Sequence, residues 1–433
     1  MQTVTIREYG AFCVGETNGG DKFGMKTLKS STFELLEAFV LETNQDEKND
    51  GLDIMGISAR RGVKKVITAK NHVGVIALKD GTVIEILPKI YDETQDGTKS
   101  ARQLLVKMLN TLNSGPPKKL QTANLAVERM NILEAFIRMF VDEVIRLTKR
   151  GLKSNYETLE DNLGCVKGKI LFSEHIRRNF AHKERVYVAY DEFTVNRPEN
   201  KLLKSTLSYL YSHTREPRNK KDIKNLLNTF SDVELSANYD ADFERIVPDR
   251  NTKSYETALN WARVFLKKKS FTSFAGSTVS IALLFPMEKL FECYVPALMK
   301  RYLARENRNF TITTQDSRYY LTDEPRKRFR LRPDIVLTLD GATYIMDTKW
   351  KRLNADPHDN YGISQGDMYQ MYAYYHRYKS KQSNVKGVTL IYPGTPNPQG
   401  DIYFNIDNTD EKIRIRFIDL KEDEDSVKEI ISG

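Results

Sequence analysis

The most constraining feature of the sequence is the segment Arg326–Lys351, which has the pattern of a β-hairpin. Asp340-Gly341 is typical of a tight two-residue turn, because both residue types tolerate positive φ. We expect one strand over about residues 327–338 and a second over residues 343–350. Successive side chains of a strand point to opposite faces, so the pattern predicts which residues lie together.

Alternation sorts the charged and apolar side chains of this hairpin onto different faces. The apolar face of the first strand is predicted to carry Phe329, Leu331, Ile335 and Leu337. Its other face is predicted to carry Arg328, Arg330, Arg332 and Asp334. On the second strand Asp347 and Lys349 are two residues apart and share a face. The sequence therefore predicts that Asp334, Asp347 and Lys349 meet on adjacent strands.

Two carboxylates and a lysine in this arrangement suit metal-dependent phosphodiester cleavage. Carboxylate oxygens hold Mg²⁺ and leave positions open for water and a phosphate oxygen. The ion acidifies bound water, and the lysine can orient that water or stabilise developing charge. The alternative is a solvated hairpin with ordinary surface charges. The half-buried setting of Asp347, in residues 344–350, favours a PD-(D/E)xK nuclease site with Asp334, Asp347 and Lys349 as catalytic residues.

A predicted helix over residues 285–299 adds two candidate ligands. Pro286 suits a first helical turn, and Glu288 and Glu292 lie four residues apart on one side. Either glutamate could be a third metal ligand, and a solvent-facing pair is the alternative. Glu292 is favoured over Glu288 because it follows the most apolar turn.

A second predicted helix covers residues 364–378. Ser364 and Asp367 form a capping-box-like start, and Gln370 and Tyr374 face one way. The same Gln-x-x-x-Tyr spacing occurs after the catalytic strands of RecB-like nucleases, where it lines the site and contacts DNA. The alternative is an aromatic helix packed on the sheet, the role expected here for Met368, Met371, Tyr372 and Tyr375.

The three arginines of the first strand have two interpretations. Arg328, Arg330 and Arg332 point the same way as Asp334 in the predicted strand, and could hold the DNA backbone beside the site. A solubilising edge strand is the alternative.

Length and patterning indicate an α+β multidomain protein. The 433 residues divide into a β-rich N-terminal domain (1–115), a mainly helical middle region (116–275) and a C-terminal α/β nuclease domain (276–433). Residues 63–67, 73–78 and 82–86 are predicted strands, with the turn at Asp80-Gly81, and residues 31–41 a helix. Residues 44–53 suit a polar loop, 113–119 a break, and 125–150 a long amphipathic helix ending at Gly151.

Composition narrows the setting without identifying a function. A net charge of +9 raises the expectation of a nucleic-acid partner, although the 67 basic and 58 acidic residues are mixed. We expect no signal peptide, no membrane span and no disulfide framework from three separated cysteines, which fits a reducing cytoplasm. Six scattered histidines form no zinc-like set, and neither glycine-rich near miss, residues 19–27 or 164–170, is a Walker A motif.

The ordered set of motifs resembles the McrC family, the nuclease subunits of McrBC-type restriction systems. The resemblance rests on the hairpin and on Val73–Leu78, Ile84–Lys89, Arg150–Leu152, Val166–Ile170, Asn196–Lys204 and Phe285–Glu292. It implies a Mg²⁺-dependent endonuclease that cuts modified, methylcytosine-containing foreign double-stranded DNA. It also implies a partner, the hexameric AAA+ GTPase McrB, which uses GTP. This chain would bind that partner through its own N-terminal domain. By motif match, Asp334, Asp347 and Lys349 take the catalytic positions.

Two other functions remain open at this point. A RecB-like repair nuclease would have the same site, but the N-terminal and middle motifs argue against it. A non-cutting adaptor would activate an AAA+ NTPase and grip DNA with a decayed nuclease domain; the intact Asp334, Asp347 and Lys349 argue against decay.

Overall fold

A computed structural model describes residues 2–45, 54–90, 95–112, 131–246, 254–266, 279–354, 356–382, 384–394, 402–406 and 411–432. The chain separates into two compact units, residues 1–132 with 275–433, and residues 133–274. The second unit lies within the residues of the predicted middle region, 116–275, and the predicted N- and C-terminal domains fall mainly in the first unit. Most of the predicted loop at 44–53 and all of the predicted break at 113–119 lie outside the described residues.

The N-terminal part of the first unit contains two sheets. One has the order β1-β8-β7-β12, formed by Thr3–Arg7, Val83–Leu87, His72–Leu78 and Val279–Pro286. The other has the order β3-β4-β2-β6-β5, formed by Asp21–Lys22, Met25–Leu28, Ala11–Val14, Val63–Ala69 and Met55–Arg60. Helices α1 (Ser30–Gln45) and α2 (Gln95–Leu112) accompany them. The predicted hairpin at Asp80-Gly81 is confirmed, because β7 and β8 pair antiparallel.

Strand β12 was not predicted, although it joins this sheet from two hundred residues away in sequence. Its run Ile281–Phe285 is buried on both faces, and such a run has no alternation to distinguish a strand from a helix. At Gly74, a Cβ atom would lie 2.0 Å from the Leu283 carbonyl oxygen, so the β7–β12 pairing requires glycine there.

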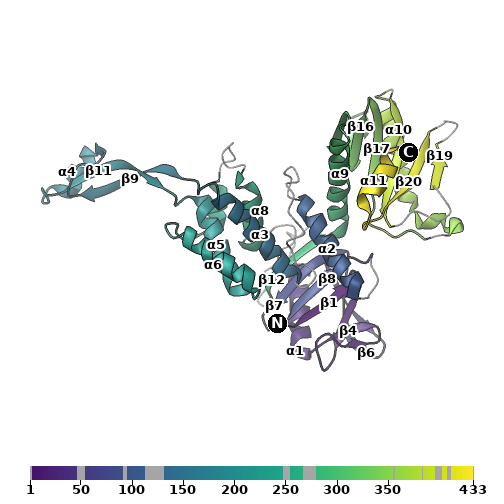
Figure 1. The fold of residues 1–433 in the computed structure, drawn as a ribbon, viewed down its shortest axis with the longest axis horizontal. Helices are drawn as coiled ribbons and strands as arrows, with labels where there is room; N and C mark the ends of the chain where they lie inside the picture. The colour runs from purple at the N-terminus through teal and green to yellow at the C-terminus, as the bar shows by residue number, and fades with distance from the viewer. Residues whose placement is uncertain are drawn as a thin grey trace. The chain divides into compact units, whose positions relative to one another are not determined.

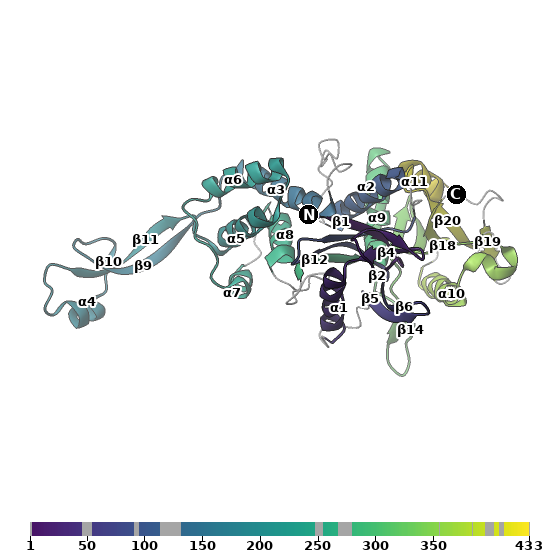
Figure 2. The ribbon, with the colours of Figure 1, turned by 90° about the horizontal axis from the view of Figure 1, so that it is seen from below.

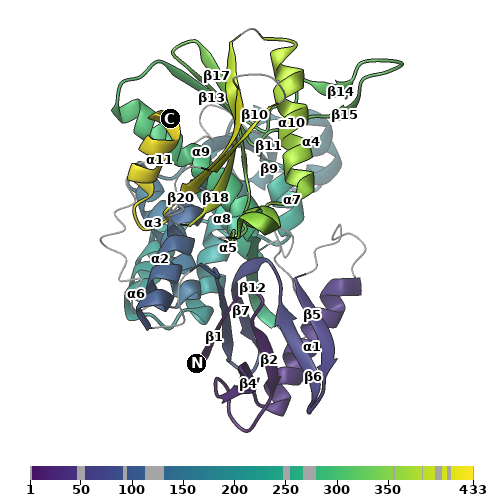
Figure 3. The same cartoon turned by 90° about the vertical axis from the view of Figure 1, so that its right-hand side faces the viewer.

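The C-terminal part of the first unit contains a six-stranded sheet of order β13-β16-β17-β18-β20-β19. Its strands are Phe310–Thr314, Ile335–Leu339, Ala342–Thr348, Val385–Pro393, Lys412–Ile418 and Ile402–Asn405. Helix α10 (Gln365–Lys379) covers one face, and α9 (Met287–Arg305) and α11 (Asp423–Ser432) cover the other (Figure 3). A 3-10 segment, Pro357–Gly362, precedes α10. The predicted mixed α/β character is therefore confirmed.

The predicted hairpin exists, but its first strand is shorter than expected. Asp340 and Gly341 both have positive φ and join β16 to β17 antiparallel, as predicted. However, the strand breaks between Leu331 and Asp334, and residues before the break form β15 (Arg328–Arg330), which pairs with β14 (Tyr320–Thr322) in a separate small sheet. Pro333 has no N–H for a sheet ladder, which explains the break. The prediction of one continuous strand over residues 327–338 is wrong.

The second unit combines a helical core with a long β-ribbon. Its helices are α3 (Ile132–Thr148, its first residue in the other unit), α5 (Pro198–His213), α6 (Pro217–Thr229), α7 (Tyr239–Glu244) and α8 (Glu256–Leu266). The ribbon has the order β10-β11-β9, formed by Lys169–Ile170, Val186–Thr194 and Asn155–Leu163, and α4 (Phe172–Asn179) lies at its far end (Figures 1 and 2). Strand β9 was missed because its mostly exposed, charged residues lack apolar alternation.

None of the helices in the described residues is long and apolar enough to cross a membrane.

Candidate active site at the edge of the C-terminal sheet

The local topology brings Asp334 and Asp347 to one edge of the six-stranded sheet. Asp334 directly precedes β16, and Asp347 lies at the end of β17. Because the strands are antiparallel and Ile335 pairs with Met346, the start of one strand lies beside the end of the other. Strand β17 continues through α10 to the parallel strand β18. Ligand sites of open α/β sheets commonly lie at such carboxyl ends.

The Asp334 carboxylate is held on both oxygens by hydrogen bonds. Thr348 donates to Oδ2 from its backbone nitrogen (2.8 Å) and from Oγ1 (2.7 Å). Gln315 donates from Nε2 to Oδ1 (2.8 Å), and its backbone nitrogen donates to the Asp334 carbonyl oxygen (3.1 Å). These contacts fix the orientation of the carboxylate before any ligand arrives.

Asp347 is a buried carboxylate beside a second one. The residue is 2% exposed. Burial raises the pKa of Asp347 to about 6, and the negative charge of Asp334 adds to the rise. Lys349 opposes it, with Nζ 2.6 Å from Asp347 Oδ2. Two carboxylates this close disfavour each other's charge, which is the electrostatic condition that a bound cation would relieve.

Lys349 is charged and held in place by α10. Its Nζ donates to Gln370 Oε1 (2.9 Å) and lies 3.7 Å from Asp367 Oδ1. Burial, the largest single effect, lowers its pKa, but the charge and hydrogen bond of Asp347, together with the charges of Asp367 and Asp334, outweigh burial and raise the pKa of Lys349. A lysine that stays protonated acts as a fixed positive charge and not as a general base.

The two α10 residues singled out from the sequence have different surroundings. Gln370 is half-buried, and besides accepting from Lys349 it donates from Nε2 to Tyr374 Oη (2.7 Å). Tyr374 is 3% exposed, and its pKa is raised by burial. Gln370 is therefore adjacent to the candidate catalytic lysine, whereas Tyr374 supports Gln370 from behind. Of the expected packing residues, Tyr372 is instead 43% exposed.

The glutamates of α9 separate into one near the site and one away from it. Glu292 is half-buried; burial raises its pKa, and the charge of Asp334 contributes. Its Oε1 lies 2.8 Å from Lys289 Nζ. Glu288 is exposed, and its charge acts on Glu8 instead. The structure thus brings Glu292, and not Glu288, toward Asp334.

The three arginines do not share a strand face with Asp334, because the strand breaks between them. Arg328 and Arg330 lie on β15 in the separate two-stranded sheet. Only Arg332, after β15, lies near enough to Glu292 to act on its charge. The predicted common face was wrong because Pro333 interrupts the ladder.

The donor set fits Mg²⁺ better than a metal that needs a complete protein cage. Within the described ranges, no three His, Cys, Asp or Glu side chains form a group that could hold a metal ion. Mg²⁺ is commonly held by one or two carboxylates together with water and phosphate oxygens. Asp334 and Asp347 supply two carboxylates, and burial together with the charge of Asp334 raises the pKa of Asp347.

Sequence reasoning missed several residues that shape the site. Thr348 stands between Asp347 and Lys349 in the motif, so its contact with Asp334 could have been inferred from the hairpin register. Gln315 has no local signal, since it reaches Asp334 only because β13 pairs with β16. Asp367 was assigned only a capping role.

A second missed feature links the motif to the N-terminal sheet. Trp350 follows Lys349, and its Nε1 donates to both Glu8 oxygens (3.2 and 3.0 Å). The backbone nitrogen of Lys89 also donates to Glu8 (3.1 Å). Glu8 is 4% exposed, and burial raises its pKa. Phe291 packs on Trp350 with ring centroids 5.3 Å apart, so Glu8 anchors the strand end that carries the lysine.

The sequence matches one family model, which is described as the McrBC 5-methylcytosine restriction system component. The match covers residues 67–393, about three quarters of the chain. The chain belongs to this McrBC family. The match includes both strands of the hairpin and α10. A curated relative, the type IV methyl-directed restriction enzyme EcoKMcrBC of Escherichia coli (strain K12), is 20% identical over 289 residues, which are 64% of this chain and 81% of the relative.

Solved McrBC structures share the fold. A half-complex from a tetradecameric assembly of Thermococcus gammatolerans McrB AAA+ hexamers with bound McrC aligns with a TM-score of 0.71 at 17% identity, covering 100% of this chain and 99% of that chain. The cryo-EM structure of the Thermococcus gammatolerans McrBC complex aligns with a TM-score of 0.52 at 19% identity, covering 70% and 88%. At these identities the likeness concerns the fold.

Proposed function

We propose that the chain is the Mg²⁺-dependent DNA endonuclease subunit of a McrBC-like, GTP-driven restriction complex that cuts methylcytosine-containing DNA. The observation that carries this proposal is the assembly of Asp334, Asp347 and Lys349 at adjoining strand ends, with Lys349 held by Gln370. Membership of the McrBC family supports the restriction role. The C-terminal sheet with its three helices would then be the PD-(D/E)xK nuclease domain.

In this proposal each side chain has a defined task in phosphodiester hydrolysis. Asp334 and Asp347 would hold Mg²⁺, and Glu292 would become a further ligand only by moving closer to them, since the three carboxylates form no ready metal-binding group in the described residues. When bound, the ion acidifies water and offsets charge on the phosphate. Lys349, being protonated, orients the attacking water or stabilises negative charge on the reacting phosphate. Gln370 fixes the lysine and faces the DNA; Tyr374, being buried, holds Gln370 and does not contact DNA itself.

The decisive experiment compares wild type with Asp347→Asn in the presence of the genomically adjacent AAA+ GTPase, GTP, Mg²⁺ and methylated plasmid. Wild type should linearise the plasmid, and the variant should not. Asp340→Asn is the matched control, because it makes the same change at the exposed turn of the same hairpin, where asparagine tolerates positive φ. Control and wild type should cut equally.

The other outcomes of this experiment separate the alternatives. Equal cutting by wild type and Asp347→Asn would overturn the site assignment. Stimulated GTP hydrolysis without cutting by either protein would favour the adaptor. Cutting without partner or nucleotide would favour a repair nuclease.

The partner in this proposal is a McrB-like hexameric AAA+ GTPase, and in one solved relative McrC is bound to McrB AAA+ hexamers. The described residues offer a surface for it on α4 and its C-cap residue: Phe172, Ile176 and Phe180 repeat every four residues and are 68%, 66% and 87% exposed. Apolar side chains this exposed indicate a binding surface. This surface lies in the middle region, whereas the resemblance implied the N-terminal domain, whose candidate loop lies mostly outside the described residues.

Serine substitutions can test the α4 surface. Ile176→Ser with Phe180→Ser should abolish stimulation of the partner's GTP hydrolysis, because two exposed apolar contacts are lost. Tyr403→Ser, which changes a 52% exposed aromatic residue on β19, should leave the stimulation unchanged. Unchanged stimulation in the double variant would place the partner elsewhere.

A further inference from the structure

The hairpin formed by β14 and β15 is a separate basic element at the border of the candidate site. It is not part of the six-stranded sheet, and Figure 3 shows it extending away from that sheet on the side of α10. Residues 323–330 are all exposed. Residues 320–332 contain five basic side chains and two acidic ones, which gives the hairpin a net positive charge.

The ion pairs of the acidic residue Asp323 are formed with residues outside the hairpin. Asp323 pairs with Arg377 of α10 and lies 3.8 Å from Lys381 Nζ. Arg326 and Arg328 make no ion pair within the part of the chain that the structure describes. Such uncommitted, exposed guanidinium groups are suited to phosphate oxygens.

Phe329 lies between two arginines and is exposed despite two costs. Its side chain is 71% exposed, and its φ of +55° is unfavourable for a residue with a bulky side chain. Backbone strain of this kind costs on the order of 1–3 kcal/mol and commonly marks a ligand-contacting position. Its neighbour Arg330 is committed to the hairpin, since it donates from Nε to Tyr320 Oη (3.0 Å).

The base of the hairpin is fixed to both the site and α10. The backbone nitrogen of Leu331 donates to the Tyr319 carbonyl oxygen (2.9 Å), and Leu331 is 9% exposed. Tyr319 packs edge-on against Tyr378 of α10, with ring centroids 4.7 Å apart. Phe329 precedes Asp334 by five residues, so the chain limits their separation to about 17 Å at ~3.3–3.6 Å per residue. That is roughly five base-pair steps of duplex DNA.

We propose that Phe329 is a DNA-contacting residue, whose ring stacks against a base of the duplex beside the cut while Arg326 and Arg328 hold the flanking phosphates. This inference rests on the proposed nuclease function and adds a site to it. An exposed aromatic ring that follows two arginines without ion pairs in the described residues matches a polyanion that carries stacked bases. A protein partner would require a larger apolar patch, such as that on α4.

The test measures stacking and affinity separately. Phe329→Asn removes the ring, and asparagine tolerates the left-handed backbone. The full chain carrying Asp347→Asn, which blocks cutting, is mixed with the AAA+ partner, GTP, Mg²⁺ and a methylated duplex that contains 2-aminopurine at successive positions. The chain with Phe329 should raise 2-aminopurine fluorescence at one or two positions, because stacking of the ring unstacks the base.

Adding Phe329→Asn should remove that fluorescence rise and weaken binding roughly tenfold, within the ~1–3 kcal/mol of a base–aromatic contact. Tyr403→Ala, which removes a 52% exposed aromatic ring on β19, should change neither readout. Unchanged fluorescence in the Phe329→Asn protein, with or without weaker binding, overturns the stacking role. If that substitution instead reduces only stimulated GTP hydrolysis, the hairpin contacts the partner and the proposal is overturned.

Cutting assays distinguish this failure from failure of the proposed function. If the chain with native Asp347 cuts methylated plasmid and Phe329→Asn alone leaves binding, fluorescence and cutting unchanged, only the hairpin proposal fails. If the native chain does not cut, the nuclease proposal fails whatever the hairpin does.

Discussion

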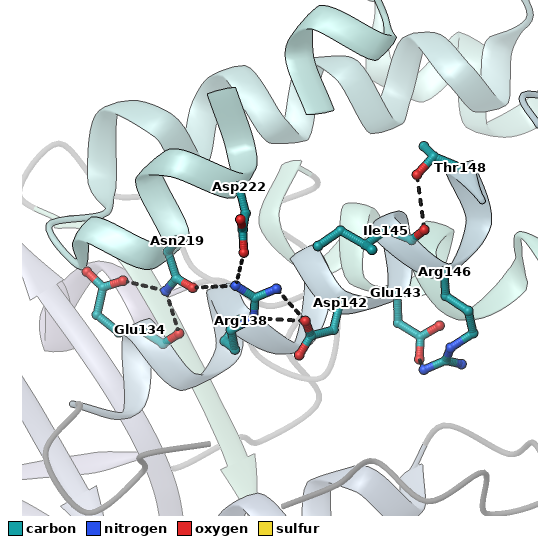
Figure 4. A network of polar contacts seen from close by, with 9 residues as sticks. All are labelled: Glu134, Arg138, Asp142, Glu143, Ile145, Arg146, Thr148, Asn219 and Asp222. Atoms are coloured by element: carbon teal, nitrogen blue, oxygen red, sulfur yellow. Dashed lines mark hydrogen bonds and ion pairs between the residues drawn. The ribbon is translucent and has the colours of Figure 1, made fainter. Parts of the chain in front are cut away.

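Two buried polar networks, one in each compact unit, have similar ingredients but opposite electrostatic balance. In the middle unit, Arg138 is 3% exposed and pairs with Asp142 and Asp222, with Nη1 2.7 Å from Asp222 Oδ2 (Figure 4). Glu134 in the same network accepts from Oγ1 of Thr214 (2.6 Å), the residue that follows α5. Here each buried charge faces an opposite charge or hydrogen-bond donors.

The network at the sheet edge lacks this balance. Asp334 and Asp347 repel each other, and Lys349 is shared between Asp347 and the more distant Asp367. A protein that needed only stability would avoid this arrangement, because replacing one carboxylate with a neutral side chain would relieve it. The comparison teaches that burial of charge does not by itself indicate a functional site, whereas buried like charges beside a fixed cation favour one.

The largest expected effect comes from removing the cation of the unbalanced network. Lys349→Met should lower the cleavage rate by about 10²–10³-fold, the range for losing one preorganised electrostatic stabiliser. GTP hydrolysis by the partner should be unaffected. Single-turnover cleavage with saturating partner measures this, and Lys351→Met is the control at an exposed lysine two residues on. A fall of less than threefold would contradict the role of Lys349.

Removing the cation of the balanced network should act on stability instead. Arg138→Met should lower the free energy of unfolding by about 2–3 kcal/mol, below the ~3–5 kcal/mol of a fully buried pair because Asp142 and Asp222 are partly exposed. Cleavage per folded molecule should be unchanged. Denaturant unfolding is the measurement. Arg146→Met, which breaks a more exposed pair with Glu143 on the same helix, should cost less than ~1 kcal/mol. If both variants lost the same free energy of unfolding, the Arg138 ion pairs would contribute no more to stability than the Arg146–Glu143 pair.

The pH dependence of stability should also differ between the networks. In metal-free protein the pKa of Asp347 is raised to about 6. Between its ordinary pKa and that value, the folded state binds more protons than the unfolded state, so the free energy of unfolding falls as pH rises from about 4 to 6. The loss over the whole titration should be about 3 kcal/mol, at ~1.4 kcal/mol per pKa unit.

Asp347→Asn removes the group responsible, so this part of the slope should disappear in the variant. Chemical denaturation with a chelator at several pH values measures the difference between the two proteins. If the free energy of unfolding varied with pH in the same way for wild type and Asp347→Asn, the pKa of Asp347 would not be raised. The two networks would then not differ in this electrostatic property.

The sequence predicted those parts of the site that depend on local pattern. Asp334, Asp347 and Lys349 are close together because a tight turn and strand alternation are local properties, and α10 begins at Ser364 because its side chain caps the helix. The prediction that Arg328 shares a strand face with Asp334 was wrong, because Pro333 interrupts the hydrogen-bond ladder of the strand. This local effect of proline outweighed the alternation of side chains. Gln315 and Glu8 could not be found, since their contacts depend on strand pairing and packing between distant segments.

Gln315 provides the smallest and most specific test of the comparison. It donates to Asp334 Oδ1 (2.8 Å) and adopts a φ of +52°. Gln315→Asn keeps a side chain that tolerates this backbone but shortens its reach by one carbon, so Asp334 retains only the Thr348 donors. Supporting contacts of this kind typically change metal affinity or activity by ~10–100-fold, and we expect about tenfold here because Thr348 remains. The Mg²⁺ concentration for half-maximal cleavage should rise, whereas the free energy of unfolding should change little.

Gln382→Asn, which weakens a contact with Tyr319 Oη (3.1 Å), is the matched control and should leave the Mg²⁺ dependence unchanged. If Gln315→Asn lowers stability without moving the Mg²⁺ midpoint, Gln315 belongs with the balanced, structural kind of network and Asp334 is oriented by Thr348 alone.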